Sequence, residues 1–395
     1  MHTGLFAVVK TLVPLSVYIL SMVMVFRAMT GKIEIPLMFL IAILPLRNVV
    51  DKLHVYPLGK DIIDIFIISL LLGIIVKAMT NKNENLFSRS PINPIIAVLI
   101  LYTFMSLIQG AMYLNEYKLF SLSDPRVQTW KNFCILPILF IITFNGIKEK
   151  KWIWRIIAVM CVSMVFMDYY LLMQISWFSS LVSRNKIKGT FVFLGPNEVA
   201  AFYNQYTIIL MSIYFCMKRS WVKIALGSLI VTNIFCVLFL FSRAAYIGIA
   251  VGMFFLFSLK NRKYLILLLL VLIFWQLVLP EKIKQRIGET TNEYGELDES
   301  SANRLIVWQY SIDMFSENPI TGVGYGVFSQ MGFGLTDTHN IYLKILAEQG
   351  LVGITIFLLL ILVFFLQGAK LASGGEDDLE KGLGLGYAIC IIVLM

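Results

Sequence analysis

The stretch from Leu351 to Leu366 reads LVGITIFLLLILVFFL and contains no charged residue. With its flanks it forms an apolar run over residues 341–367, which exceeds the roughly 20 residues that span a bilayer as a helix. Inside lipid a backbone has to satisfy its own hydrogen bonds, so such a run is expected to be helical. This stretch therefore predicts an integral membrane protein.

Similar apolar runs recur from one end of the chain to the other. Of its 395 residues, 58% are hydrophobic and 14% are charged, against about 25% charged in an ordinary soluble domain. The mean hydropathy of +0.80 would leave too much apolar surface for one soluble core. We therefore predict an all-α fold, a polytopic bundle of about 12 transmembrane helices. The predicted spans are residues 5–26, 33–50, 61–79, 94–113, 130–145, 152–175, 197–217, 222–241, 244–259, 264–280, 341–367 and 383–395.

The basic residues predict how the bundle is oriented. The net charge of +9 could suggest nucleic acid, but Lys and Arg gather in short loops between apolar runs, as they do on the cytoplasmic side of membrane proteins. With those loops in the cytoplasm, the long hydrophilic segment 281–338 falls on the outer face, and so does the N-terminus. The predicted organisation has four parts: N-terminal spans (1–189), central spans (190–280), the outer-face loop (281–338) and C-terminal spans (339–395).

The predicted outer loop contains an amphipathic helix. Leu305, Trp308, Ile312 and Phe315 recur at helical spacing and define one apolar face. That face suits two positions equally: the membrane interface, or packing on the helix's own loop.

A glycine-rich stretch follows the helix in the same loop. Its glycines end helices and permit tight turns, and turn formation is favoured over the alternative of a backbone nest for phosphate. The glycines are Gly322, Gly324, Gly326, Gly332 and Gly334.

Two arginines are hard to explain as packing residues. Arg243 lies between two apolar runs with almost no loop, where an arginine facing lipid would cost about 3 kcal/mol, so it is expected to face a cavity or ligand. Snorkelling to the headgroups is the alternative. Arg304 opens the amphipathic helix, where a cation opposes the helix dipole, so a partner is expected unless the charge is simply solvated.

His339 stands immediately before the last long apolar run. Asp337 or Thr338 is expected to cap that helix and to place His339 in its first turn. The positive helix end disfavours imidazolium, so a neutral ring able to accept a proton is expected, and an anion such as a diphosphate would be welcome there. A structural role is the alternative. No second histidine or cysteine is close enough in sequence to suggest a metal site, and no cofactor is expected.

Several short motifs occur in order in the second half of the chain. They are GPN at 195–197, FSRA at 241–244, Arg304 with Trp308, PITGVGYG at 319–326, His339-Asn340, and GLVG at 350–353.

This combination resembles the C-terminal signature of the bacterial O-antigen ligase and polymerase superfamily, over residues 190–367. The resemblance implies an all-helical inner-membrane bundle with one large periplasmic loop. It implies an enzyme that transfers a glycan from undecaprenyl diphosphate to an acceptor hydroxyl, without a metal. A single in-line displacement, which would invert the anomeric centre, is the hypothesis for this transfer. By motif position, it implies that His339, Arg304 and Arg243 are catalytic. The residues implied to bind substrate are Arg243, Arg304, Arg286 and Asn340.

Three functions remain open at this stage. An O-antigen or exopolysaccharide polymerase is favoured over a ligase, which would transfer the glycan to lipid A core or, as an oligosaccharyltransferase, to a protein. A transporter without chemistry is the alternative from another class, but the spans show no inverted repeat of broken helices. The expected partners are the lipid-linked donor, a glycan or lipid acceptor and the bilayer, without nucleic acid. The expected location is the bacterial inner membrane, with the site on the outer side.

Overall fold

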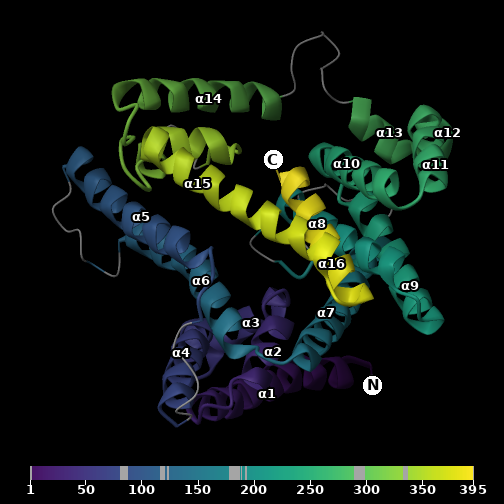
Figure 1. Cartoon of the computed structure of the whole chain (residues 1–395), viewed down its shortest axis with the longest axis horizontal. Helices are drawn as coiled ribbons and strands as arrows, with labels where there is room; N and C mark the ends of the chain where they lie inside the picture. Colours follow the sequence, from purple (N-terminus) through teal and green to yellow (C-terminus); the bar gives the residue numbers. More distant parts are fainter. Residues whose placement is uncertain are drawn as a thin grey trace. The chain divides into compact units, whose positions relative to one another are not determined.

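The computed structural model describes residues 2–80, 88–115, 121, 124–177, 187, 189–191, 194–288, 299–331 and 337–394. Across these residues the chain is helical, and none of them lies in a β-strand. The predicted all-α class is thereby confirmed (Figure 1). Gly332 and Gly334 of the glycine-rich stretch lie outside the described residues.

Nine helices in the described ranges are long and apolar enough to cross a membrane. Each corresponds to one of the predicted spans, and the two short predictions, 130–145 and 244–259, extend into their flanks. The helices are α1 (His2–Met29), α4 (Ile62–Thr80), α5 (Asn93–Tyr113), α6 (Pro125–Gly146), α7 (Lys150–Trp177), α8 (Pro196–Cys216), α9 (Ser220–Phe239), α10 (Arg243–Lys260) and α15 (Ile341–Gly374).

The other three predicted spans are shorter helices. The prediction at 33–50 breaks into α2 (Glu34–Ile43) and α3 (Arg47–Val50), because Pro45 has no N–H with which to continue the helix. The prediction at 264–280 yields α11 (Arg262–Ile273) and α12 (Trp275–Val278). The last span becomes α16 (Asp378–Leu394), whose first turn carries two acidic residues. The count of about 12 spans is thus not reached within the described residues.

The chain forms two compact units, which are described separately. The first comprises residues 1–88, 140–283 and 368–395, and the second comprises residues 89–139 and 284–367. In the first unit, α8 is the central helix: over half of its apolar window is buried, the largest share among the nine helices. It packs against α9, α10 and α16, and this cluster forms the apolar core of the unit.

Glycines allow α16 to approach α8 closely. A Cβ atom at Gly382 would lie 2.7 Å from the Cα of Ile213, and one at Gly386 would lie 2.8 Å from the Cα of Ile209. These two glycines stand four residues apart on one helix face, the spacing that lets membrane helices pack backbone to backbone. Helix α16 therefore packs on α8 through close backbone contact rather than through bulky side chains.

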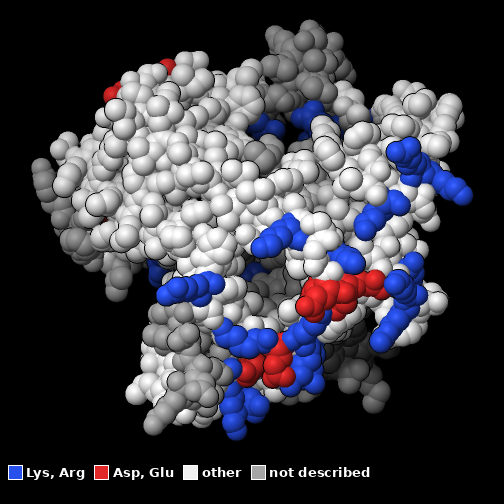
Figure 2. Space-filling view, viewed as in Figure 1, with Lys and Arg blue, Asp and Glu red and all other residues white. Residues whose placement is uncertain are grey.

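Charged side chains gather in part of the face seen in Figure 2, where acidic residues lie among basic ones. In the first unit, Lys150 at the start of α7 bonds Asp377 at 2.9 Å and Glu380 at 2.6 Å. Lys218 pairs with Asp378 at 3.9 Å. The loops predicted to be cytoplasmic are thus linked to the start of α16 by ion pairs.

Candidate functional site

The glycine-rich stretch of the second unit forms a tight turn. Gly322, Gly324 and Gly326 all have positive φ angles, 72°, 119° and 77°. The N–H groups of Val323 and Gly324 donate to carbonyls of α15, and that of Tyr325 donates to a carbonyl of α5 at 2.9 Å. Because these donors are already bonded to carbonyls, the predicted turn is confirmed and the phosphate nest is not supported.

The turn fits a break in α15. Gly350 has φ 63° and ψ −161°, which interrupts the helix after its first nine residues. Beyond the break, the N–H groups of Leu351 and Val352 donate to Pro319 O and Ile320 O at 2.9 and 3.1 Å. At the break, these N–H groups lose their carbonyl partners within the helix and bond instead to carbonyls of the segment that precedes the glycine turn. These bonds fix that segment to α15, the helix that follows His339.

The amphipathic helix is α14 (Glu299–Glu317), and it packs on its own loop. Val307 and Met314 are buried against Val323, Val327, Phe328 and Ala347. The predicted apolar face is rotated from the observed one, since Leu305 and Ile312 remain exposed. Of the two open alternatives, packing on the loop is the one that the structure shows.

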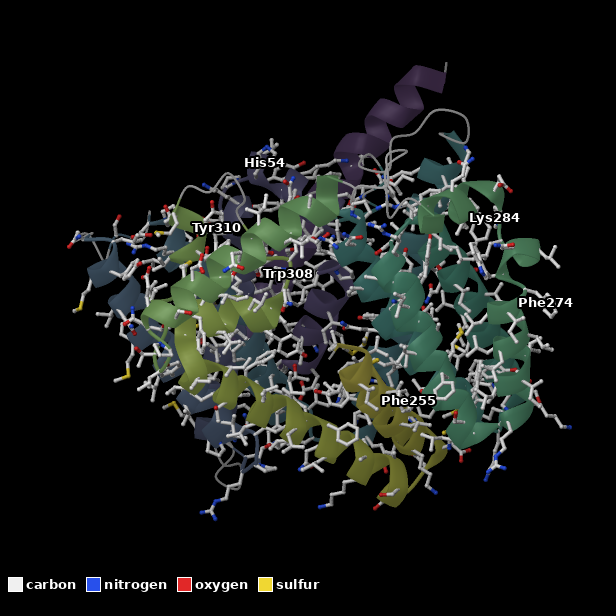
Figure 3. The ribbon with its side chains drawn as sticks, turned by 90° about the horizontal axis from the view of Figure 1, so that it is seen from above. His54, Phe255, Phe274, Lys284, Trp308 and Tyr310 are labelled. Atoms are coloured by element: carbon white, nitrogen blue, oxygen red, sulfur yellow. The ribbon has the colours of Figure 1, made fainter. Side chains whose placement is uncertain are left out.

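Trp308 connects α14 to the segment around His339. Its indole Nε1 donates to the carbonyl of Thr338 at 3.1 Å. Arg304 stands one turn earlier, at i−4, and so shares the helix face of Trp308; Figure 3 shows Trp308 on α14. Arg304 Nε is buried and has no hydrogen-bond partner among the described residues. The structure therefore brings Arg304 and the His339 segment to one region of the second unit.

The cap of α15 differs from the prediction. Asn340, rather than Asp337 or Thr338, caps the helix: its Oδ1 accepts the N–H groups of Tyr342 and Leu343 at 3.0 and 3.3 Å. Asparagine competes well with Asp and Thr as an N-cap, and here Asp337 is held by Lys344 at 3.0 Å instead. The side-chain oxygen of Asn340 thus has a structural task, and substrate binding by Asn340 stays a prediction.

His339 consequently lies one residue before the cap, not in the first turn. It is exposed and has a φ of 52°. Thr338, which precedes it, is fully buried, and its hydroxyl donates to Asn340 O at 2.8 Å. The imidazole is therefore presented at the surface from a backbone that is fixed on both sides.

Replacement of Trp308 by phenylalanine tests this connection. The variant loses the hydrogen bond to Thr338 O but keeps an aromatic ring, so about 1 kcal/mol of positioning energy is removed. We expect the glycan transfer that the motif resemblance implies to fall about fivefold in kcat, with KM nearly unchanged. The control is Tyr310→Phe, a change on the same helix; an equal loss of kcat in both variants would contradict a positioning role for Trp308.

Arg243 belongs to the first unit, in the turn predicted between two spans. Helix α9 ends at Phe239 and α10 begins at Arg243, with Ser242 as its N-cap accepting the N–H of Ala245 at 3.4 Å. The Tyr246 hydroxyl donates to Leu238 O at 2.6 Å and closes the turn. The tight turn predicted between the two spans is confirmed, with Arg243 half-buried at the start of α10. That Arg243 faces a cavity or ligand stays a prediction.

Arg286 lies in the last turn of α13 (Glu281–Gly288), where it is half-buried. Its place in the substrate site stays a prediction, as do the roles of the other candidate residues.

Two buried charged residues near the glycine turn were missed by sequence reasoning. Arg126 is 2% exposed and bonds Asp124 at 2.9 Å, and a Cβ at Gly326 would lie 2.9 Å from its Cγ. The hydrogen bond from Arg126 lowers the pKa of Asp124, so this carboxylate stays charged. Glu348 is also 2% exposed, and its Oε1 accepts the N–H of Phe328 at 3.2 Å. Each is a charged residue within or beside an apolar run, and this pattern could have indicated from the sequence that the charge is buried and has a partner.

A family model described as O-antigen ligase matches residues 228–358, a region that contains Arg243, Arg304 and His339. No curated protein matches the chain. The family match confirms, over residues 228–358, the resemblance predicted from the motifs.

Proposed function

We propose that the protein is a membrane glycosyltransferase that extends a glycan carried on undecaprenyl diphosphate, as an O-antigen or exopolysaccharide polymerase does. In this reaction the growing glycan is the donor and a hydroxyl of the next lipid-linked repeat unit is the acceptor. The coarser assignment, a glycosyltransferase of the O-antigen ligase and polymerase type, follows from the family match.

One observation carries the proposal. The matched region contains a buried arginine nitrogen, Nε of Arg304, that no described residue satisfies. An unsatisfied buried donor is costly, so a ligand that accepts from it would be bound favourably. Arginine's planar fork suits the oxygens of a diphosphate, and the link through Trp308 sets this donor in the region of the exposed His339.

The proposed chemistry is a single in-line displacement. The acceptor oxygen forms a bond to the anomeric carbon while the bond from that carbon to the diphosphate oxygen breaks. Undecaprenyl diphosphate leaves with its charge stabilised by Arg304, and His339 takes the proton of the acceptor hydroxyl. The same charge-stabilising role stays a sequence-based prediction for Arg243. Because the nucleophile attacks opposite the leaving group, the anomeric centre inverts.

The arginines are tested by glycan transfer in liposomes, using purified protein, a synthetic undecaprenyl-diphosphate oligosaccharide and EDTA. Arg304→Ala and Arg243→Ala are each expected to lower transfer about 10²-fold, with part of the activity restored in the lysine variants. Arg262→Ala, at the start of α11 just beyond the end of α10, is the matched control and should remain near wild type. Normal turnover in Arg304→Ala would contradict the proposed role of Arg304 in binding the diphosphate. Transfer that depends on a metal ion would contradict the proposed mechanism.

A ligase is the second candidate, because the matching family model is described as O-antigen ligase. The same assay separates the two functions. Extension of the lipid-linked glycan from donor alone supports a polymerase. Transfer only after addition of lipid A core, or of a protein acceptor, supports a ligase or an oligosaccharyltransferase. No transfer with any of these acceptors would overturn both and favour transport.

We further propose that the enzyme resides in the bacterial inner membrane with segment 281–338 on the periplasmic or outer side. The support is the distribution of Lys and Arg among the loops. A membrane-impermeant thiol reagent applied from outside the cell tests this on two variants, Gln330→Cys and Arg262→Cys. Labelling of Gln330→Cys is expected. Labelling of Arg262→Cys alone would show the opposite orientation.

A further inference from the structure

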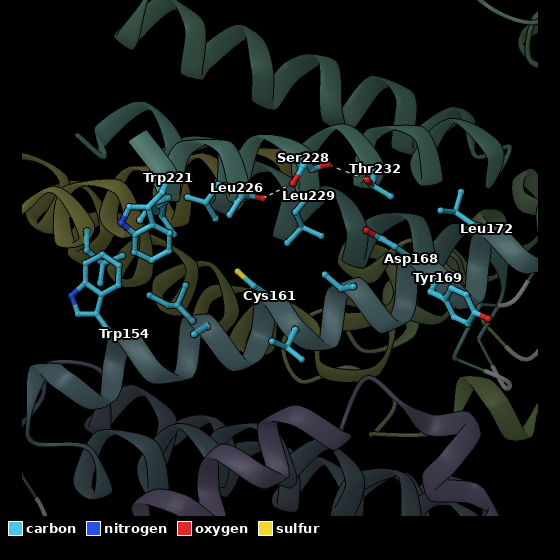
Figure 4. A pocket seen from close by; sticks show the side chains of 18 residues that line it. Trp154, Cys161, Asp168, Tyr169, Leu172, Trp221, Leu226, Ser228, Leu229 and Thr232 are labelled. Carbon is cyan, nitrogen blue, oxygen red and sulfur yellow. Dashed lines mark hydrogen bonds between the residues drawn. The ribbon is translucent and has the colours of Figure 1, made fainter. Parts of the chain in front are cut away.

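An apolar groove runs along the first unit between α7 and α9. Its volume is about 670 Å³, and it lies wholly within this unit. Figure 4 shows Trp154 and Trp221 at one end, Cys161 near the middle, and Asp168 with Tyr169 and Leu172 at the other end. Aliphatic side chains of both helices line the stretch between the ends, so the groove would accept a hydrocarbon chain.

The length of the groove fits a lipid chain. From Trp154 to Asp168 the α7 backbone rises by about 21 Å at 1.5 Å per residue. One leaflet of a bilayer contributes about 15 Å, half of the hydrocarbon thickness. The Asp168 carboxylate, which can accept the Asn233 amide at 2.9 Å, lines the groove toward its far end. The apolar part is therefore long enough for a whole acyl chain from one leaflet.

A polar pocket adjoins the tryptophan end. It has a volume of about 460 Å³ and shares Trp154 and Trp221 with the groove. Two basic and two acidic residues line it: Lys218, Arg219, Asp377 and Asp378. The pocket thus combines positive and negative groups at the level where aromatic residues mark a membrane interface.

Within the described residues, the pairing inside this pocket leaves one cation unpaired and one anion in a single long ion pair. Asp377 is bonded by Lys150 at 2.9 Å. Among the residues that the structure describes, the Asp378 carboxylate has only the 3.9 Å ion pair with Lys218, whose side chain is 89% exposed. The Arg219 guanidinium makes no hydrogen bond or ion pair with any residue that the structure describes. A ligand that carries both a phosphate and an ammonium group would complement this pair.

We propose that the groove and its polar pocket bind a zwitterionic phospholipid with a primary ammonium group, of the phosphatidylethanolamine type. Its phosphate lies at Arg219, its ammonium group donates to Asp378, and one acyl chain occupies the groove toward Asp168. The lipid enters from the leaflet on the side of the basic loops. This site is separate from the residues proposed for glycan transfer, since Arg243, Arg304 and His339 line neither the groove nor the pocket.

The experiment is native mass spectrometry of the full-length protein released from nanodiscs with equal amounts of phosphatidylethanolamine, phosphatidylglycerol and phosphatidylcholine. We expect one retained phosphatidylethanolamine in preference to the other two lipids. Arg219→Ala is expected to lower its retention about fivefold, the factor for about 1 kcal/mol. Asp378→Asn is expected to remove the preference over phosphatidylcholine, whose quaternary ammonium cannot donate a hydrogen bond.

Matched variants make the result specific. Lys223→Ala removes one positive charge a helical turn from Arg219, at a residue that lines neither cavity, and should retain the lipid normally. Ala225→Phe fills the groove and should abolish retention, whereas Ile247→Phe on the lipid-exposed side of α10 should not. Equal retention of the three lipids, or an equal effect of Lys223→Ala and Arg219→Ala, would overturn the proposal and indicate annular lipid only. Preferential retention of phosphatidylglycerol would overturn the ammonium assignment.

Discussion

Replacement of His339 by alanine is expected to lower glycan transfer by about two to four orders of magnitude, the usual contribution of a general base. The acceptor hydroxyl is a poor nucleophile until its proton is removed, and the exposed His339 ring is offered beside the capped start of α15. The effect should appear in kcat, measured as single-turnover transfer in liposomes. Donor binding should change little, because the diphosphate is proposed to be held by the arginines.

The backbone at His339 makes the control variant important. Its φ of 52° is a left-handed conformation, which alanine adopts less readily than histidine or asparagine. His339→Asn keeps a residue suited to this turn but provides no base at neutral pH. Loss of transfer in both variants, with unchanged thermal unfolding, would support the base. Near-normal turnover in His339→Asn would show that the residue serves the turn alone.

Replacement of Gly350 by alanine is expected to destabilise the protein by about 3 kcal/mol or more. The φ and ψ angles of Gly350 fall in a region that is almost restricted to glycine, which costs other residues about 1–3 kcal/mol. A Cβ atom there would also lie 2.4 Å from Ile320 O and 2.6 Å from Gly322 N. Both contacts are to backbone atoms, so the glycine turn would have to move away from α15.

The midpoint of thermal unfolding in detergent measures this effect. The matched control is Gly374→Ala at the end of the same helix, where nothing lies within 4 Å of the added Cβ and a small rise in stability is expected. Gly350→Ala should also lower glycan transfer, since the turn and His339 flank the same segment of α15. An unfolding midpoint for Gly350→Ala equal to that of Gly374→Ala would contradict the break in the helix.

The sequence alone determined the class of the protein and the place of most of its helices. Uninterrupted apolar runs such as 351–366 lie within observed helices, because a backbone in lipid has no other way to satisfy its hydrogen bonds. The turn at Arg243 was predictable for a related reason: two apolar runs meet there with no room for a longer loop. The order of the motifs was sufficient to predict the superfamily.

Hydropathy did not predict where the shorter helices begin and end. Apolar composition continues through residues 33–50, yet Pro45 separates two short helices there. Hydropathy measures how residues partition into lipid and does not register where a helix breaks, so the predicted count of about 12 spans is not confirmed within the described residues.

Only the tertiary structure decided how the candidate site is built. Which face of α14 is buried depends on Val323, Val327 and Phe328, which come from a loop that no helical period describes. The choice of Asn340 as the cap depends on Lys344 holding Asp337, and the pairing of the glycine turn with Gly350 joins residues about 30 apart in sequence. Arg126 is buried under a glycine two hundred residues away. Apolar patterning fixes which segments enter the membrane because each run responds to lipid locally, whereas caps, faces and buried charges depend on partners that only the folded chain brings together.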